Sequence, residues 1–213
     1  MVLPVAEFRL RRSLRKKLQA FRRQAAHCEI RIDSAFRDVI TACSTKEREG
    51  QAGTWIVPEM VDAYTELHLA GHAHSVETWV DGQLVGGLYC VALGRAVFGE
   101  SVFTHETDAS KIALAHLVRF LEQHGFGLID CQMNTAHLAS LGAREIPRDD
   151  FIARLRELTG SPPASTRWAV DGARLGGGFV RVFHDSRVTI SPRKECGSDE
   201  VIRTSTKLCT RRG

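Results

Sequence analysis

Three neighbouring segments of the chain have the composition of β-strands and are separated by tight turns. The segments 74–80 (HSVETWV) and 83–92 (QLVGGLYCVA) flank an Asp-Gly dipeptide at 81–82. This dipeptide is typical of a two-residue hairpin turn, because both central residues of that turn need positive φ angles. The short turn sequence LGR leads into a third segment, 96–103 (AVFGESVF). The pattern predicts three consecutive antiparallel strands, which restricts the possible folds more than any other feature.

Segments with helical spacing surround these strands. Apolar residues at intervals of three and four, together with terminal Pro, Gly or Asp, predict helices over residues 7–24, 35–44, 58–71, 108–125 and 148–158. Asp33 or Ser34 is expected to cap the second of them. The segment 128–132 (LIDCQ) predicts a short strand. Antiparallel hairpins with helices before and after them indicate a mixed α+β sheet domain.

Basic side chains are concentrated towards both ends of this chain of 213 residues. Residues 1–30 hold eight basic and two acidic side chains, residues 31–164 hold 11 and 18, and residues 165–213 hold 10 and 5. This asymmetry suggests contact with a polyanion such as RNA, although a solvated basic helix face explains the charge alone equally well. The eight basic residues of the first segment are Arg9, Arg11, Arg12, Arg15, Lys16, Lys17, Arg22 and Arg23.

Several classes of protein lack support in the sequence. No apolar run reaches the roughly 18 residues of a membrane helix, and the first residues do not form a signal peptide. The six cysteines show neither CxxC nor the Cys/His spacing of a zinc site. The motifs GxSxG, GxGxxG and the P-loop are absent from the sequence. We therefore expect a cytoplasmic protein with reduced thiols, without a bound metal or cofactor.

Polar residues interrupt two of the strand-type segments. In 128–132, Asp130 and Gln132 are two residues apart, so a strand would point both side chains to the same face. Glu100 lies in the otherwise apolar segment 96–103, where an ionised carboxylate is costly unless it meets a cation. That cation could belong to a ligand, but an internal Arg is the commoner partner. Each signal alone is therefore weak.

Seven longer strings are more informative when taken together. They are GTWI (53–56), AY..LH..G.AHSVE.W (63–79), LVGGLYC (84–90), FGESVF (98–103), ASK.AL (109–114), IDCQ (129–132) and HLASLGA.EIPR.DF (137–151). In this order and spacing, the strings closely resemble leucyl/phenylalanyl-tRNA-protein transferases, bacterial enzymes of the N-end rule pathway. The resemblance covers roughly residues 2–160.

The resemblance implies both a fold and an activity. The fold would be that of the acetyltransferase-like (GNAT) superfamily, with the catalytic domain over residues 30–160. The activity would transfer Leu or Phe, and less readily Met, from aminoacyl-tRNA to the α-amine of a protein that begins with Arg or Lys, which marks it for degradation. The aminoacyl ester already holds the free energy of the reaction, so this step would need no ATP, metal or cofactor. The partners would be aminoacyl-tRNA and the acceptor protein, and we expect a monomer.

The family motifs also imply roles for individual residues. Gln132 would be catalytic, its amide orienting the attacking amine, while Asp130 would hold that amide from the same strand face. The proton would leave through Gln132 or through the ribose hydroxyl next to the ester, and the sequence leaves both routes open. Glu100, in the GES motif, would contact the cationic side chain at the acceptor's N-terminus. The eight basic residues of the first segment would bind phosphates of the tRNA acceptor stem.

The donor side chain would need an apolar pocket. Leu117 and Leu121 match this pocket but lie on a predicted helix, and for these two a place in the hydrophobic core is an equally good explanation. Val102 stands where the family usually has Met, so the preference between Leu and Phe stays open. The positions that match the family's pocket are Trp55, Leu88, Val97, Val102, Leu117 and Leu121.

The match to the family is incomplete at both ends. Relatives usually carry several tens of residues before the position of Met1, so we interpret residues 1–29 as a basic helical remnant of a truncated N-terminal domain. Residues 161–213 are interpreted as an extension that is weakly ordered or of unknown structure. Two other hypotheses stay open: a catalytically impaired tRNA-binding relative, and an acyl-CoA-dependent GNAT enzyme. The latter is the weaker hypothesis, because THETD (104–108) replaces the usual pyrophosphate-binding turn.

Overall fold

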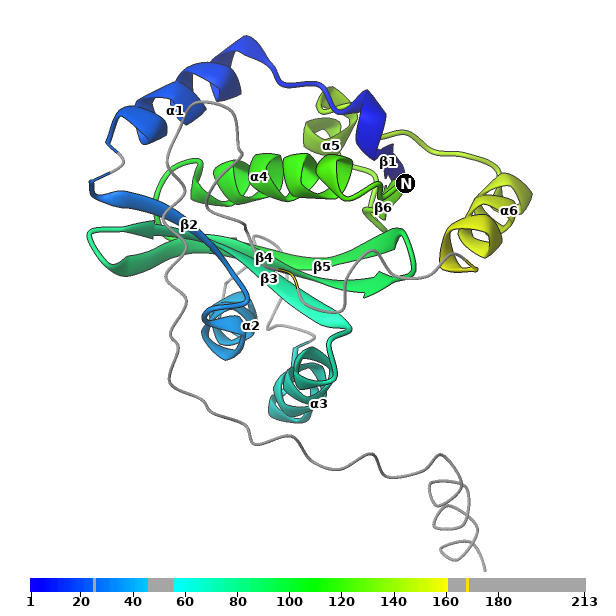
Figure 1. Cartoon of the computed structure of the whole chain (residues 1–213), viewed down its shortest axis with the longest axis horizontal. Coiled ribbons are helices and arrows are strands. Elements are labelled where there is room, and N and C mark those ends of the chain that lie inside the picture. The colour runs from blue at the N-terminus through cyan, green and yellow to red at the C-terminus, as the bar shows by residue number, and fades with distance from the viewer. Residues whose placement is uncertain (25, 46–55, 161–167, 169–213) are drawn as a thin grey trace, which may run out of the picture. The chain divides into compact units, whose positions relative to one another are not determined.

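A six-stranded sheet lies at the centre of the computed structural model, which describes residues 1–24, 26–45, 56–160 and 168 (Figure 1). All of these residues belong to the first of two compact units, Met1–Val182 and Phe183–Gly213. The strands follow the order β1-β6-β5-β4-β3-β2. β5 and β6 are parallel, and every other neighbouring pair is antiparallel. The strands are β1 (Val2–Pro4), β2 (Cys28–Ile32), β3 (Ala73–Val80), β4 (Gln83–Leu93), β5 (Ala96–Thr104) and β6 (Leu128–Asp130).

The predicted hairpins are confirmed. Asp81 and Gly82 have φ angles of 49° and 75°, so both central residues of the first turn adopt the left-handed conformation that this turn requires. Gly94, between β4 and β5, has a φ angle of 59°. These local turns place β3, β4 and β5 side by side, which agrees with the mixed α+β sheet expected from the sequence.

Helices cover both faces of the sheet (Figure 1). α1 (Arg12–Arg23), α4 (Ala109–Gln123) and the short α5 (Ala136–Ser140) lie on one side, and α2 (Phe36–Ser44) and α3 (Pro58–Leu69) lie on the other. A 3-10 turn, η1 (Val5–Glu7), joins β1 to the segment before α1. α6 (Arg148–Thr159) lies at the start of β5, where the Arg95 amide donates to the Leu158 carbonyl at 2.9 Å.

The two faces of the sheet form separate apolar cores because successive strand residues point to opposite sides. On the α4 side, Leu88 and Val97 pack with Leu117 and Leu121. On the side of α2 and α3, the residues next in sequence along the strands, such as Tyr89, pack with residues of α2. α4 is thus held against the same sheet face as the expected donor pocket.

Several boundaries differ from those expected. The first helix begins at Arg12 rather than near residue 7, because η1 precedes it and Arg11 is extended. β1 and β2 were not expected, and the strand predicted over 128–132 ends at Asp130. Asp108 precedes α4 as expected, but its carboxylate accepts a hydrogen bond from Lys111 at 2.6 Å instead of capping the helix amides.

The segment 1–29 contributes to the sheet as well as to α1. β1 pairs with β6, and the Val5 amide donates to the Gly127 carbonyl at 3.2 Å. The boundary at residue 29 stays a prediction. Of the expected extension 161–213, only Trp168 lies within the described residues, and it is buried in the core on the α4 side.

Gly86 is a position where β4 meets the first turn of α4 closely. A methyl group at Gly86 would lie 2.5 Å from the Ala109 side chain and 3.1 Å from backbone atoms of Ala109 and Ser110. Gly86→Ala is therefore expected to lower the free energy of unfolding by about 1–3 kcal/mol, as overpacking does elsewhere. Urea denaturation measures this change.

Gly99→Ala is the matched control for that substitution. A methyl group at Gly99 would lie 3.5 Å from the Asp130 carbonyl oxygen, which is an ordinary contact. We expect its unfolding free energy to stay within about 1 kcal/mol of the parent. Equal destabilisation by both substitutions would contradict the close packing of β4 against α4.

Candidate active site where β5 and β6 separate

Glu100 lies in a β-bulge of β5. Tyr89 of β4 pairs with Ser101, whereas the next residue, Cys90, pairs with Gly99, so Glu100 has no partner on β4. A bulge of this kind changes the direction of a side chain at a sheet position. It allows the half-buried Glu100 to leave the regular alternation of an otherwise apolar strand.

The carboxylate of Glu100 is held by a tyrosine of α3. The Tyr64 hydroxyl donates to Glu100 Oε2 at 3.1 Å, and the Tyr64 ring packs edge-on against Tyr89 at a centroid distance of 5.3 Å. Burial, followed by the charge and hydrogen bond of Glu100, raises the pKa of Tyr64 to about 12. Among the described residues Glu100 forms no ion pair, so the internal Arg considered from the sequence is not found there.

β6 ends beside this bulge. Its three residues pair with Ala96, Val97 and Phe98 of β5, and β5 then continues to Thr104 paired with β4 on its other side. Gly99 lies next to the Asp130 backbone, as the 3.5 Å spacing between a built methyl group and the Asp130 carbonyl shows. The structure therefore brings Glu100 close to the end of β6, where the two strands separate.

Gln132 follows β6 in an unusual backbone conformation. Its φ angle is 59°, and its backbone amide donates to Asp130 Oδ1 at 2.9 Å. The left-handed conformation is uncommon for a residue with a side chain and is found most often in turns and functional sites. The expectation that Asp130 and Gln132 share a strand face is therefore wrong. Asp130 closes a turn through its side chain, as Asp often does, and holds the backbone of Gln132 instead of its amide group.

The side chain of Gln132 is available to a ligand. It is exposed, and within the described residues no hydrogen-bond partner of its amide group is found. The preceding residue, Cys131, donates its backbone amide to the Met1 carbonyl at 2.9 Å, which ties this turn to β1. Burial, and secondly the charge of Asp130, raises the pKa of the Cys131 thiol to about 11. The thiol is therefore protonated near neutral pH and is a poor nucleophile.

Four of the six residues predicted for the donor pocket lie together. Leu88, Val97, Leu117 and Leu121 are each at most 3% exposed and form one cluster between the sheet and α4. Ile129 of β6, next to the site, belongs to the same cluster.

The other two pocket residues differ from that cluster. Val102 is 42% exposed, so it does not share the cluster's burial. Trp55 lies outside the described residues. The assignment of these six residues to a donor pocket therefore stays a prediction.

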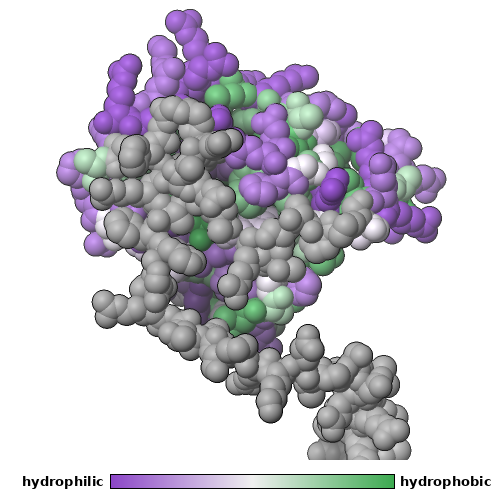
Figure 2. Space-filling view, in the orientation of Figure 1, coloured by the Kyte–Doolittle hydropathy of each residue, from purple (hydrophilic) through white to green (hydrophobic). Residues whose placement is uncertain are grey.

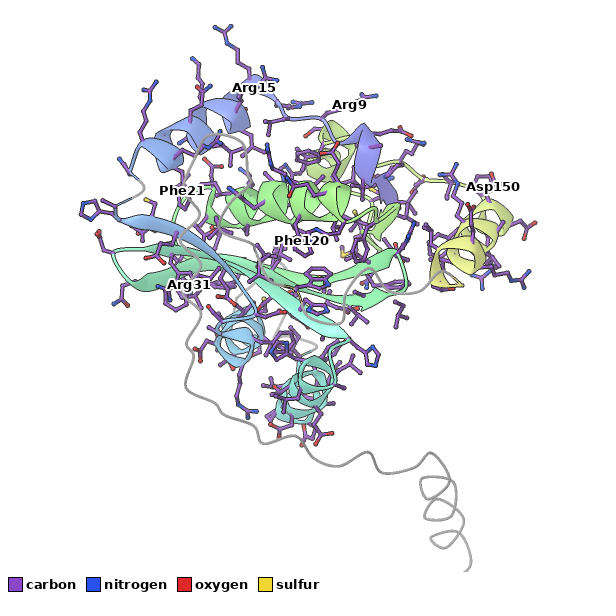
Figure 3. All side chains as sticks on the ribbon, in the orientation of Figure 1. Arg9, Arg15, Phe21, Arg31, Phe120 and Asp150 are labelled. Carbon is purple, nitrogen blue, oxygen red and sulfur yellow. The ribbon has the colours of Figure 1, made fainter. Side chains whose placement is uncertain are left out.

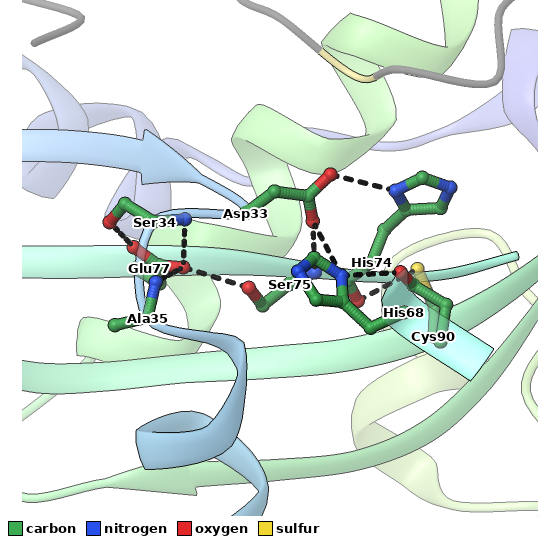
Figure 4. Close-up of polar contacts among 9 residues, drawn as sticks. Asp33, Ser34, Ala35, His68, His74, Ser75, Glu77 and Cys90 are labelled. Atoms are coloured by element: carbon green, nitrogen blue, oxygen red, sulfur yellow. Dashed lines mark hydrogen bonds and ion pairs between the residues drawn. The ribbon is translucent and has the colours of Figure 1, made fainter. Parts of the chain in front are cut away.

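A buried carboxylate that the sequence analysis did not single out lies below the sheet (Figure 4). Glu77 is 0% exposed. Its oxygens accept hydrogen bonds from the Ser34 and Ala35 amides, each at 3.0 Å, from the Ser75 hydroxyl at 2.7 Å and from Trp79 Nε1 at 3.2 Å. The Ser34 hydroxyl donates to it as well. These donors compensate for the cost of burying the charge.

Glu77 supplies the cap that was expected from Asp33 or Ser34. α2 begins after Ala35, whose own side chain cannot cap it, and the free amides before the helix point at the Glu77 carboxylate. The expected local cap is therefore replaced by a residue more than 40 positions away in sequence. A negative charge at this end of a helix is also favoured by the helix dipole.

Asp33 binds a buried histidine instead (Figure 4). His74 Nδ1 donates to Asp33 Oδ2 at 2.8 Å, and the Ser75 amide donates to Asp33 Oδ1 at 2.8 Å. The His74 ring, 2% exposed, stacks on Trp168 with a centroid distance of 4.0 Å. His74 and Glu77 both belong to the string AHSVE.W, which was the only sequence signal for this network.

The eight basic residues of the first segment are all exposed. Figure 2 shows hydrophilic side chains gathered over α1, and in Figure 3 Arg15 extends from α1 and Arg9 from the segment before it. Lys17 Nζ lies 3.4 Å from Asp108 Oδ2, and Arg11 Nε donates to the Ser140 carbonyl at 3.3 Å. The structure thus gathers these charges on one helix and the segment before it.

Fold and site together define an α+β protein whose polar site lies where two parallel strands separate. Residues 2–156 match the description "Leucyl/phenylalanyl-tRNA protein transferase", so the chain belongs to that family.

Individual relatives support the same family. A protein of that name from a Polaromonas species is 63% identical over 157 residues, covering 74% of this chain and 61% of the relative. Another, from Albidiferax ferrireducens, is 61% identical over 171 residues, covering 80% and 66%. This chain therefore spans less than two thirds of the length of either relative. Among solved structures, L-PGS from Bacillus licheniformis has a TM-score of 0.39 and 9% identity, covering 70% of this chain and 53% of that one.

Two absences hold for the described residues alone. Within them, no helix has both the length and the apolar character needed to cross a membrane. In the same part of the chain, no three His, Cys, Asp or Glu side chains are grouped closely enough to hold a metal ion.

The Glu77 network makes a prediction about stability. Glu77→Gln places an NH2 group among donors, so buried donors lose their acceptor, and the free energy of unfolding should fall by about 1–3 kcal/mol. The control is Asp62→Asn, which removes an exposed ion pair with Arg37 and should cost less than about 1 kcal/mol. Guanidinium denaturation of both variants tests this, and a Glu77→Gln protein as stable as the parent would show that the network is dispensable.

Tyr64 makes a prediction about alkaline pH. Its pKa is raised from 10.0 to about 12 in the folded protein, so the folded state favours the protonated phenol. The stabilisation is complete below the ordinary pKa of a tyrosine and is lost as the pH rises through about 12.

Comparison with Tyr64→Phe isolates this effect from other groups that titrate in the same range. The parent should be more stable than the variant up to about pH 10, and the difference should disappear by about pH 12. Unfolding free energies measured across this range provide the test. A difference that does not depend on pH would contradict the raised pKa of Tyr64.

Proposed function

We propose that this chain is an aminoacyl-tRNA-protein transferase that moves Leu or Phe, and less readily Met, to the α-amine of proteins with an N-terminal Arg or Lys. Membership of the family supports this proposal. The observation that carries it is the juxtaposition of Glu100, whose carboxylate has no ion-pair partner among the described residues, and the exposed amide of Gln132 where β6 ends beside β5.

The reaction is aminolysis of an ester. The amine nitrogen of the acceptor attacks the ester carbonyl carbon, a C–N bond forms, and the C–O bond to the tRNA ribose breaks. The amine loses one proton and the ribose oxygen gains one, so no further reactant is consumed. An α-amine has an ordinary pKa of about 7.7–8.0, so part of it is neutral near pH 7 without a strong base.

Gln132 fits the needs of this reaction. Its amide oxygen accepts a hydrogen bond from the amine and aligns the nitrogen with the ester carbonyl, which lowers the entropic part of the barrier. Asp130 acts as a positioning residue, because its hydrogen bond fixes the backbone from which the Gln132 side chain extends. The proton leaves through Gln132 or through the neighbouring ribose hydroxyl.

Glu100 accounts for the choice of acceptor. Its carboxylate pairs with the guanidinium or ammonium group of the N-terminal residue, and a charge-assisted hydrogen bond of this kind is stronger than a neutral one. Tyr64 keeps the carboxylate in place by donating to Oε2. The acceptor's cation then stands where an internal Arg would otherwise be expected.

The donor is bound by two different surfaces. Its Leu or Phe side chain lies among the apolar residues between the sheet and α4, with Trp55 and Val102 completing the pocket. The basic residues of α1 and of the segment before it bind phosphates, a contact that depends on salt and not on RNA sequence. We place the protein in the cytoplasm as a monomer, where its products enter N-end rule degradation.

The acyl-CoA hypothesis is disfavoured by the turn before α4. The amides of His105 and Glu106 both donate to the Val85 carbonyl, at 2.8 Å and 3.2 Å, so they are not free for a pyrophosphate. The carboxylate of Asp108 stands at the same helix end and would repel one. The impaired-relative hypothesis is one outcome of the following test.

Transfer of radiolabelled Leu from Leu-tRNA to a protein with N-terminal Arg tests the proposal. The parent should transfer Leu, and Gln132→Ala should lose at least about tenfold in kcat. Glu100→Gln should lose about tenfold to 100-fold in kcat/KM for the Arg acceptor, because a half-buried charge-assisted contact is removed.

Asp149→Asn, an exposed change on α6, serves as the control and should match the parent. If Glu100→Gln still prefers an acceptor with N-terminal Arg over one with N-terminal Ala as strongly as the parent does, the role of Glu100 is refuted. Salt-sensitive tRNA binding without any transfer would instead support the impaired relative.

A further inference from the structure

A second site, separate from Gln132 and Glu100, is a cavity of about 440 Å³ between η1, α1, β2 and α4. Its volume falls within the range of small-molecule sites, roughly 300–1,000 Å³. Of the site residues assigned so far, only Arg15 and Arg22 line it. The other lining residues have no role in the transfer reaction as described.

Both α1 and α4 contribute polar side chains to the lining of the cavity. Residues 15, 18, 19 and 22 of α1 follow the spacing of one helix face, and so do residues 115, 118, 119 and 122 of α4. Each face carries charged or polar groups where two packed helices usually bury apolar ones. The polar residues are Arg15, Gln19, Arg22, His116, Arg119 and Glu122.

The floor of the cavity is apolar and partly aromatic. Phe8 comes from the segment after η1, Phe21 from α1 and Ile30 from β2. Phe21 lies on the side of α1 that faces β2 and α4 (Figure 3). Its ring is tilted by 57° to that of His116, with the centroids 6.4 Å apart. Two aromatic faces therefore border the same space.

The charge of the cavity is positive. Three guanidinium groups line it against the single carboxylate of Glu122. Burial, and to a lesser degree the charges of Arg22 and Arg119, lowers the pKa of His116, so its ring is neutral near pH 7. Within the described part of the chain, neither Arg15 nor Arg119 forms an ion pair. The lining suits a ligand with a flat apolar part and an anionic part.

We propose that this cavity binds an unpaired nucleotide of the aminoacyl-tRNA, in its single-stranded 3′ tail. The base lies against Phe8, Phe21 and His116, and the adjoining phosphate lies on Arg15 and Arg119. This inference rests on the proposed function, which supplies the RNA. Aromatic faces combined with arginines are the usual means of binding single-stranded nucleic acid. α1 also carries most of the exposed basic residues that are proposed to bind tRNA phosphates. An RNA backbone bound to these residues would therefore lead to the cavity.

Two substitutions test the cavity itself. Gln19→Trp places a large ring at a cavity-lining position without changing the charge, and Arg119→Gln removes a guanidinium from α4. The matched controls lie on α1 but do not line the cavity: Ser13→Trp adds the same ring, and Arg12→Gln removes the same charge. Thermal unfolding establishes that each variant is folded before its binding is compared.

The measurement is the affinity of the full chain for intact tRNA and for the same tRNA trimmed of its single-stranded 3′ tail. Gln19→Trp and Arg119→Gln should weaken binding of intact tRNA by about fivefold or more, as loss of one stacked base does, and leave trimmed tRNA unaffected. Arg12→Gln should weaken both RNAs by the same factor, because it removes only a phosphate contact. Ser13→Trp should not discriminate between them.

Other outcomes would overturn the inference. If Gln19→Trp changes the affinities for both RNAs alike, or neither, the cavity does not bind the tail. A different result would point to a free nucleotide as the ligand: AMP binds the parent, Gln19→Trp abolishes AMP binding, and trimming the tRNA does not change its affinity. Tail-dependent binding without Leu transfer would refute the proposed function but not the site, whereas transfer with tail-independent binding would refute only the site.

Discussion

The carboxylate of Glu77 is completely buried and accepts hydrogen bonds from two separate segments of the chain. It fixes the start of α2 against β3, because the free amides before that helix have no local cap. Phe36, the first residue of α2, stacks on His68 of α3 at a centroid distance of 4.4 Å. α3 in turn carries Tyr64, which holds Glu100. The position of the candidate acceptor site therefore depends on a buried charge on another strand.

The opposite face of the sheet is organised around α4. Its inner side packs on the strands that separate at the site, and its outer side borders the cavity below α1. Asp33 links the two faces, since it lies next to α2 but binds His74, whose ring stacks on Trp168 in the α4-side core. One helix thus stands between the proposed donor pocket and the proposed nucleotide site.

The sequence predicted those features that depend on residues close together in the chain. The turn at Asp81-Gly82 needs only its own φ angles, and family strings marked Glu100 and Gln132 as site residues. The Asp130–Gln132 turn was missed because a three-residue strand does not differ in pattern from a longer one. The Glu77 network was missed because its partners lie more than 40 positions apart, and the cavity because it depends on how two helices are placed.

The antiparallel pairing of β1 with β6 has a practical consequence for handling the protein. Val2 lies opposite Asp130, and the Met1 carbonyl accepts the hydrogen bond of Cys131, so the chain enters the sheet beside Gln132. A purification tag fused ahead of Met1 would begin next to Gln132, at the proposed active site, and would compete there with the proposed substrates. Assays are therefore best made with the amino terminus unmodified or with the tag removed.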